Sequence, residues 1–409
     1  MRAPLTPIKA FVHDATTMGD AGDSSAADDP RLSQWLLVAQ AAERLAELRP
    51  GQRSAYVRML EGRVLPVRLG RPTQIEGDGR IPVDADAELA ERLRMEAEDM
   101  ERAGCFELAL STVSSVCQIL AKEPKKRLTA RLLATAHMGR VIRQIGELGA
   151  AADCYTTVIA EAQRAKDGPV AAHGFIGLGN VAHARGNRPS QKSFFHRALE
   201  LAARGSPVEL SAHQGLMVTA NQQGELADAL LHGWRAHDLA LPESEVQLEI
   251  IANVANTAFC AGFFVAALSG FEFVIQRSSL TRNRLPAIGG GLRAAARAGE
   301  GARVLEIERI GYEDIKRSAA PYDVARFFFC AAEAKRILND HSAVSPLVQA
   351  SLSLADTYGF HELRIRAESL LTAAAPTAHV PAPETEFVVD ASDPLVSSGI
   401  SRLYALSGT

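Results

Sequence analysis

Residues that can catalyse a reaction or bind a metal occur in this chain, but none stands in the spacing that such chemistry needs. The five cysteines are widely scattered without a Cys-x-x-Cys pair, so we expect buried free thiols rather than a disulfide framework or a zinc site. The histidines form no His-Glu-x-x-His pattern, and the glycine-rich stretch at 288–293 lacks the Lys-Ser/Thr of a phosphate-binding loop. The sequence therefore predicts no catalytic residue, no metal and no cofactor.

The composition also limits the kinds of partner that the protein can bind. The net charge of −4 provides no general attraction for nucleic acid or an anionic membrane. No run of apolar residues approaches the roughly 18 that a membrane span needs, and the first 30 residues lack the apolar core of a secretory signal. We therefore expect a cytoplasmic protein that binds neither nucleic acid nor membrane. Its abundant Ala and Arg are typical of a bacterial genome rich in G and C.

A short unit recurs along the chain and is its clearest organising feature. Each unit has a helix-like stretch, a tight turn and a second helix-like stretch. The turns fall at Gly104, Gly146, Gly186, Gly224, Gly262, Gly299 and Asn339. Subtraction gives spacings of 42, 40, 38, 38, 37 and 40 residues. Glycine suits these turns because it adopts the left-handed conformation that ends a helix at little steric cost.

Apolar and small residues recur within each unit at intervals of three or four, which is the helical period. In the second unit they include Met138, Ile142, Leu148, Ala151 and Tyr155. We interpret them as packing positions. Gly139 and Gly179 fall at equivalent places in their first helices, where a small residue lets paired helices approach closely.

These features resemble the tetratricopeptide repeat over about residues 87–375. The resemblance lies in the small residue of the first helix, the Gly turn and the Ala early in the second helix (Ala109, Ala151, Ala229, Ala267). The standard unit has about 34 residues, so these longer units resemble the long-repeat type of bacterial regulatory proteins. HEAT repeats have a comparable period and are the alternative. The resemblance implies an all-α superhelical solenoid of about seven helix pairs with disordered ends.

The same resemblance implies which side chains line a concave groove. By register they are Arg140, Arg143, His173, Asn180, His183, Gln214, Asn221, Asn256 and Arg293. An Asn amide can pair with both groups of a peptide bond, and Arg can attract a carboxylate. The alternative interpretation is that these side chains are solvated or satisfied between helices. The Lys positions of the chaperone-binding members are missing, so chaperone binding is not expected.

The remaining segments are expected to be simpler. Residues 1–30 are expected to be a disordered arm, 31–85 a short helical segment with a linker or small hairpin, 86–375 the solenoid, and 376–409 a Pro/Ala-rich flexible tail. Apolar residues near the end, among them Ile400 and Leu403, give the tail an alternative as a segment that folds back onto the solenoid.

The sequence as a whole predicts a non-catalytic scaffold or adaptor that binds another protein or an extended peptide in its groove. The alternative is a regulator whose solenoid senses a peptide or ligand and changes shape. A third hypothesis is an enzyme or DNA-binding factor that uses residues 31–85. An incompletely capped end repeat would allow a homodimer.

Overall fold

The computed structural model describes residues 30–48, 85–102, 104–122, 126–317, 321–372 and 392–406. Within these ranges the chain forms helices and turns and no strand. The expected N-terminal arm, the hairpin or linker before residue 85, and the Pro/Ala-rich stretch at 373–391 lie outside the described residues. The prediction of an all-α fold is confirmed.

The chain divides into two compact units, Met1–Arg185 and Gly186–Thr409. The helices of the first unit are α2 (Pro30–Glu47), α4 (Ala85–Arg102), α5 (Phe106–Ala121), α6 (Leu128–Gln144), α7 (Leu148–Arg164) and α8 (Gly168–Ala184). The division falls at the predicted turn at Gly186, so the two units are described separately.

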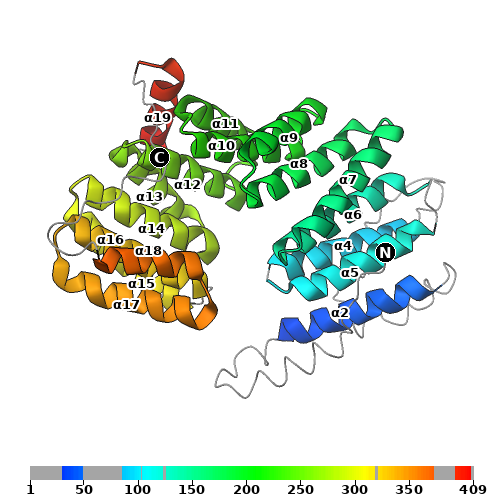
Figure 1. Cartoon of the computed structure of the whole chain (residues 1–409), viewed down its shortest axis with the longest axis horizontal. Helices are drawn as coiled ribbons and strands as arrows, with labels where there is room; N and C mark the ends of the chain where they lie inside the picture. The colour runs from blue at the N-terminus through cyan, green and yellow to red at the C-terminus, as the bar shows by residue number, and fades with distance from the viewer. Residues whose placement is uncertain are drawn as a thin grey trace, which may run out of the picture. The chain divides into compact units, whose positions relative to one another are not determined.

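The second unit holds the remaining helices, which are coloured from green to red in Figure 1. They are α9 (Arg188–Leu201), α10 (Pro207–Gln223), α11 (Leu226–Leu239), α12 (Glu245–Cys260), α13 (Phe264–Arg277), α14 (Thr281–Arg297), α15 (Gly301–Arg317), α16 (Pro321–Ile337), α17 (His341–Tyr358), α18 (His361–Thr372) and α19 (Pro394–Ala405).

All seven predicted turn residues have the left-handed backbone conformation. Their φ angles run from 60° at Asn339 to 99° at Gly146. Each of these residues lies between two consecutive helices, from α4 and α5 to α16 and α17, and at Gly186 the two helices belong to different units. A residue with a Cβ is strained at such an angle, which explains why six of the seven turns use glycine. The predicted series of helices joined by seven left-handed turns is confirmed.

Several helices begin with a side-chain cap followed by proline. Asp167, Asn187 and Ser206 each accept a hydrogen bond from the backbone N–H three residues later, and a proline follows within two residues. The cap satisfies one of the free N–H groups of the first turn, and proline removes another without loss. These short signals define where successive helices start.

In the first unit, helices pack closely where an aromatic ring meets glycine. Tyr155 of α7 lies against Gly139 of α6, and a Cβ at Gly177 of α8 would overlap the same ring. The expected close approach at Gly139 is therefore present, while the contact with Tyr155 on α8 is made by Gly177. At the start of this unit, α2 packs on α5 and α4 and covers their apolar side.

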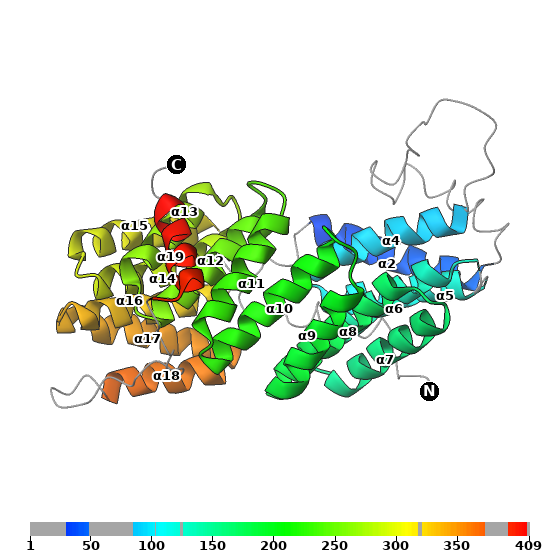
Figure 2. The same cartoon turned by 90° about the horizontal axis from the view of Figure 1, so that it is seen from above.

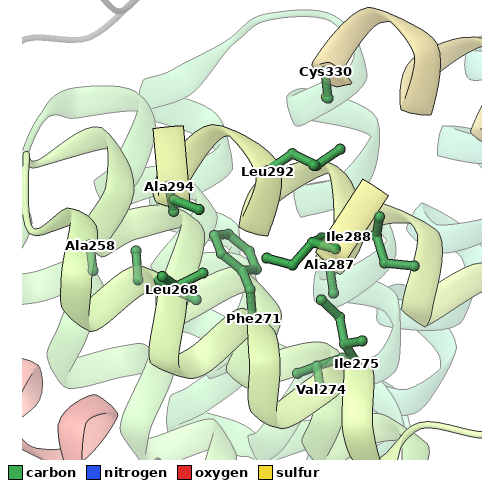
Figure 3. Close-up of a cluster of buried hydrophobic side chains, with 14 of the residues drawn as sticks. Ala258, Leu268, Phe271, Val274, Ile275, Ala287, Ile288, Leu292, Ala294 and Cys330 are labelled. Carbon is green, nitrogen blue, oxygen red and sulfur yellow. The ribbon is translucent and has the colours of Figure 1, made fainter. Parts of the chain in front are cut away.

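The second unit uses the same aromatic-on-glycine packing. A Cβ at Gly215 of α10 would lie 2.5 Å from the ring of Phe195, and one at Gly290 of α14 would overlap the ring of Phe271. Figure 3 shows Phe271 among Leu268, Ile288 and Leu292 in the apolar core. At the other end of this unit, α18 packs on α17 and covers the last pair.

The structure differs from the expected flexible tail at residues 394–405. These residues form α19, which packs on α11 and α13 of the second unit. Figure 2 shows this helix in red beside α13. Its buried residues Val396, Gly399, Ile400 and Leu403 recur at three or four positions, so the helix has one apolar face that the unit can cover.

Candidate binding surface on the first helices

Several first helices contact the first helix of the neighbouring pair in the same unit. In the first unit α4 contacts α6 and α6 contacts α8, and in the second unit α14 contacts both α12 and α16. Among the described second helices α11, α13, α15 and α17, no neighbouring pair makes contacts of this extent. A curved stack brings helices together on its inner side. The sequence analysis expects the first helices to line a concave groove, and we call the side that they form the inner face of each unit.

On the inner face of the first unit, Arg140 has partners from its own chain. Its guanidinium forms ion pairs with Glu101 at 2.8 Å and Glu98 at 3.5 Å. Glu101 also bonds His137 at 3.0 Å between its Oε2 and Nε2. Burial acts to raise the pKa of Glu101, but the bonds from His137 and Arg140 hold it below its usual value. Arg140 thus links α6 to α4, and its charge is balanced within the unit.

The other predicted residues of the first unit lie in different surroundings. His173 is half-buried, and burial lowers its pKa, with the charges of Arg140 and Arg94 acting in the same direction. His183 is exposed, Asn180 is half-buried, and Arg143 has its Nε buried without a hydrogen bond inside the protein. These residues come from α6 and α8, two first helices that contact one another.

On the inner face of the second unit, Arg293 lies where three first helices meet. Its guanidinium sits 4.5 Å above the ring centre of Phe259 on α12. Its Nη1 lies 3.6 Å from Oε2 of Glu333 on α16, which is too long for a direct hydrogen bond. The side chain is only 17% exposed, and its Nε has no hydrogen bond inside the protein. Arg293 is therefore held in place but retains unused hydrogen-bonding capacity.

The amide side chains of the same face also retain hydrogen-bonding capacity. Oδ1 of Asn221 on α10 is buried without a partner. Nδ2 of Asn256 on α12 has only a weak contact with Sγ of Cys260 at 3.9 Å within the described residues. The side chain of Gln214 is half-buried and makes no hydrogen bond within the described residues. Buried amides are normally satisfied, so a polar partner from outside the unit would complete this surface.

Two residues of α16 extend the surface beyond those found from sequence. Glu333 Oε2 and Arg336 Nε are buried without hydrogen bonds inside the protein. Both belong to the first helix next to α14, so they continue the face from Arg293. The sequence analysis placed the seventh turn at Asn339 but named no residue of that unit for the groove. Unsatisfied polar atoms thus occur on α10, α14 and α16.

Three histidines that are distant in sequence gather elsewhere in the second unit. Nδ1 of His213 lies 2.9 Å from Nδ1 of His232, and the ring of His196 is 6.4 Å from that of His232. Burial lowers the pKa of His213 and brings that of His232 to about 4. Both rings are therefore neutral near pH 7. Among the described residues, no group of three His, Cys, Asp or Glu side chains has a geometry suited to a metal ion.

Comparison with known proteins gives structural likeness alone. No protein-family model and no curated protein matches the sequence. A tetratricopeptide repeat protein from Parabacteroides merdae is similar with 14% identity and a TM-score of 0.43, over 68% of this chain and 98% of that one. The TPR2AB-domain–pHSP90 complex of yeast Sti1 is similar with 12% identity and a TM-score of 0.27, over 70% of this chain and 98% of that one. At these TM-scores, the comparison adds nothing to what the helices of this chain show by themselves.

Proposed function

We propose that this chain is a non-catalytic scaffold whose inner face in the second unit binds an extended segment of another protein. The observation that carries the proposal is the set of buried, unsatisfied polar atoms on the first helices α10, α14 and α16: Asn221 Oδ1, Arg293 Nε, Glu333 Oε2 and Arg336 Nε. A buried polar group without a partner costs about 1–3 kcal/mol. A ligand that supplies the missing partners recovers that cost upon binding.

The chemistry of these groups suits a peptide backbone. The amides of Asn221 and Asn256 each offer a donor and an acceptor, which a peptide group can match with its C=O and N–H. An extended segment has free backbone groups along its length, whereas a helix uses most of them internally. Arg293 adds one preference, because its Nε–H can bond a carbonyl or carboxylate oxygen of the bound segment. The surface should therefore bind mainly the backbone of the ligand and depend little on the ligand's sequence.

The proposed location is the cytoplasm. Among the described residues no helix is long and apolar enough to cross a membrane. The proposed partner is another protein, in keeping with the polar inner face.

The test compares three forms of the full chain. The inner-face variant carries Asn221→Ala and Asn256→Ala. The matched control carries Gln276→Ala and Gln349→Ala, two exposed amides on the second helices α13 and α17. Partners captured from the native cell are identified by mass spectrometry, and the affinity for the captured protein is then measured with purified components. All three forms must show the same helical circular dichroism.

We expect the inner-face variant to bind at least about tenfold more weakly, because two bidentate amides are lost and each 1.4 kcal/mol is a factor of ten. The control should bind like the unmodified chain. Equal affinity of the inner-face variant would show that these Asn side chains are structural. Equal loss in the control would place the partner on the outer side.

A further inference from the structure

Helix α19 occupies a place on the outer side of the second unit that a repeat protein does not need to fill. It packs on α11 and α13, the second helices of two neighbouring pairs. These two helices make no contact with each other comparable to their contacts with α10, α12 and α14. Helix α19 packs against both of them, and we call the surface that α11 and α13 present to α19 the groove.

The groove has a shape that fits this helix closely. Gly270 on α13 has Leu403 directly above it, since a Cβ there would lie 2.9 Å from Cδ2 of Leu403. Gly399 on α19 lies against Leu230 of α11, where a Cβ would be 3.1 Å from Cβ of Leu230. One glycine on each side thus allows the helices to touch. Val396, Ile400 and Leu403 supply the apolar contacts.

Polar contacts set the register of α19 in the groove. Nε1 of Trp234 donates to the carbonyl oxygen of Gly399 at 3.0 Å. The guanidinium of Arg402 lies 4.1 Å above the Trp234 ring and forms an ion pair with Asp238 at 2.5 Å. Trp234, Asp238 and Gly270 therefore favour a helix that has glycine at one position and arginine three residues later.

The walls of the groove do not depend on α19 for their own packing. Helix α11 packs on α10 and α12, and α13 packs on α12 and α14. Helix α19, in contrast, has extensive contacts with these two walls only, and with 12 residues it is too short to be a stable helix alone. Leu395 and Tyr404, at the two edges of the apolar face of α19, are exposed. In these features α11 and α13 resemble a preformed binding site, and α19 resembles a ligand that belongs to the same chain.

We propose that α11 and α13 form a second interaction surface, a helix-binding groove, which α19 of the same chain occupies reversibly. While α19 is bound, the groove is closed. Release of α19 exposes Leu230, Trp234 and Gly270 as a site for an amphipathic helix of the same pattern. The device is an autoinhibitory contact, and it does not depend on ligand binding at the inner face.

Trp234 supplies a direct readout, because the chain has only two tryptophans. In a full-length Trp35→Phe background, Trp234 is the sole emitter. In this background we would introduce Leu403→Asp, which buries a charge in the groove when α19 is bound. The matched control is Ser397→Asp, an acid on the exposed side of the same helix. A synthetic peptide of residues 392–406 is then titrated into each form.

With Leu403→Asp we expect the Trp234 emission to shift to longer wavelength, and the peptide to reverse the shift in a saturable manner. Ser397→Asp should keep the original emission. A peptide with Arg402→Glu should bind roughly tenfold more weakly, since it loses the ion pair and the contact with the Trp234 ring. The Asn221→Ala, Asn256→Ala variant should give the same titration, which separates this site from the inner face.

Three results would overturn the proposal. Unchanged emission in Leu403→Asp would mean that α19 does not cover Trp234. A shift that no peptide concentration reverses, with helical content intact, would mean that α19 is not an exchangeable occupant. Loss of helical content in both Leu403→Asp and the milder full-length Arg402→Glu would mean that α19 is a fixed part of the core.

Discussion

The glycines inside the helices set how closely neighbouring helices approach. Gly177 on α8 lies under the ring of Tyr155, so any side chain there must displace the ring. Gly149, near the start of α7, has no atom within 4 Å of the Cβ position. The two glycines differ in their packing and not in their helical state, which makes them a matched pair for substitution.

We predict opposite effects for the same substitution at these two sites. Gly149→Ala should raise the free energy of unfolding by about 0.5–1 kcal/mol, because Ala favours the helix. Gly177→Ala has the same helix-propensity gain, but its methyl group overpacks the contact with Tyr155. The free energy of unfolding should therefore fall by about 1–2 kcal/mol. Urea unfolding monitored by circular dichroism measures both. Equal stabilisation by both changes would mean that the Tyr155 ring moves aside freely.

At the scale of elements, one carboxylate joins three helices of the second unit. Glu245, the first residue of α12, accepts hydrogen bonds from the Ser278 hydroxyl at 2.5 Å, the Ser279 N–H at 2.8 Å and Asn283 Nδ2 at 2.9 Å. Burial acts to raise the pKa of Glu245, but these bonds hold it at about 2. The network sets the connection between α13 and α14, and so the placement of Arg293 relative to Asn256.

This network predicts a pH-dependent stability. The folded-state pKa of Glu245 lies below the ordinary 4.5, so its contribution is complete above pH 4.5 and is lost as pH falls towards 2. Near pH 7, Glu245→Gln should lower the free energy of unfolding by about 1–2 kcal/mol, a modest value because the carboxylate is partly exposed. The difference between the two proteins should shrink steadily below pH 4.5.

The control for that measurement is Glu243→Gln, an exposed carboxylate whose side chain makes no hydrogen bond in the described residues. It should match the unmodified chain at every pH. If the difference in free energy of unfolding between Glu245→Gln and the unmodified chain stays constant from pH 7 to pH 3, packing and not charge accounts for the loss of stability.

At the scale of the whole molecule, the apolar cores follow the two compact units. One large cluster of buried side chains runs from Val38 to Val141 and another from Met217 to Leu403. Helical repeats contact mainly their neighbours, so stability adds up locally along the chain. A chain with two such cores has the material for two cooperative unfolding steps.

We therefore predict two unfolding transitions that respond to different substitutions. Gly177→Ala should lower the midpoint of one transition, and Glu245→Gln should lower the midpoint of the other. Hydrogen exchange measured by mass spectrometry in increasing urea assigns each transition to Met1–Arg185 or Gly186–Thr409. A single transition shifted equally by both substitutions would show that the chain unfolds as one unit.

The sequence by itself determined the helix pairs and their turns. Six glycines and Asn339 at regular spacing predicted seven turns that the structure shows with a positive φ, because left-handed backbone strongly favours these residue types. The positive φ angles at Lys166, Gly205, Glu243 and Gly359 lie outside that spacing and were not predicted. The apolar period within each pair determined which side of each helix is buried. These features depend on local conformation, which a single sequence carries directly.

The tertiary structure alone decided which polar side chains have partners and where the last helix packs. Arg140 was predicted for partner binding, yet it pairs with Glu98 and Glu101, more than 35 residues away. Helix α19 meets Trp234 across 165 residues of sequence. Such contacts depend on how separate helices are brought together, and neither local propensity nor the repeat period contains that information.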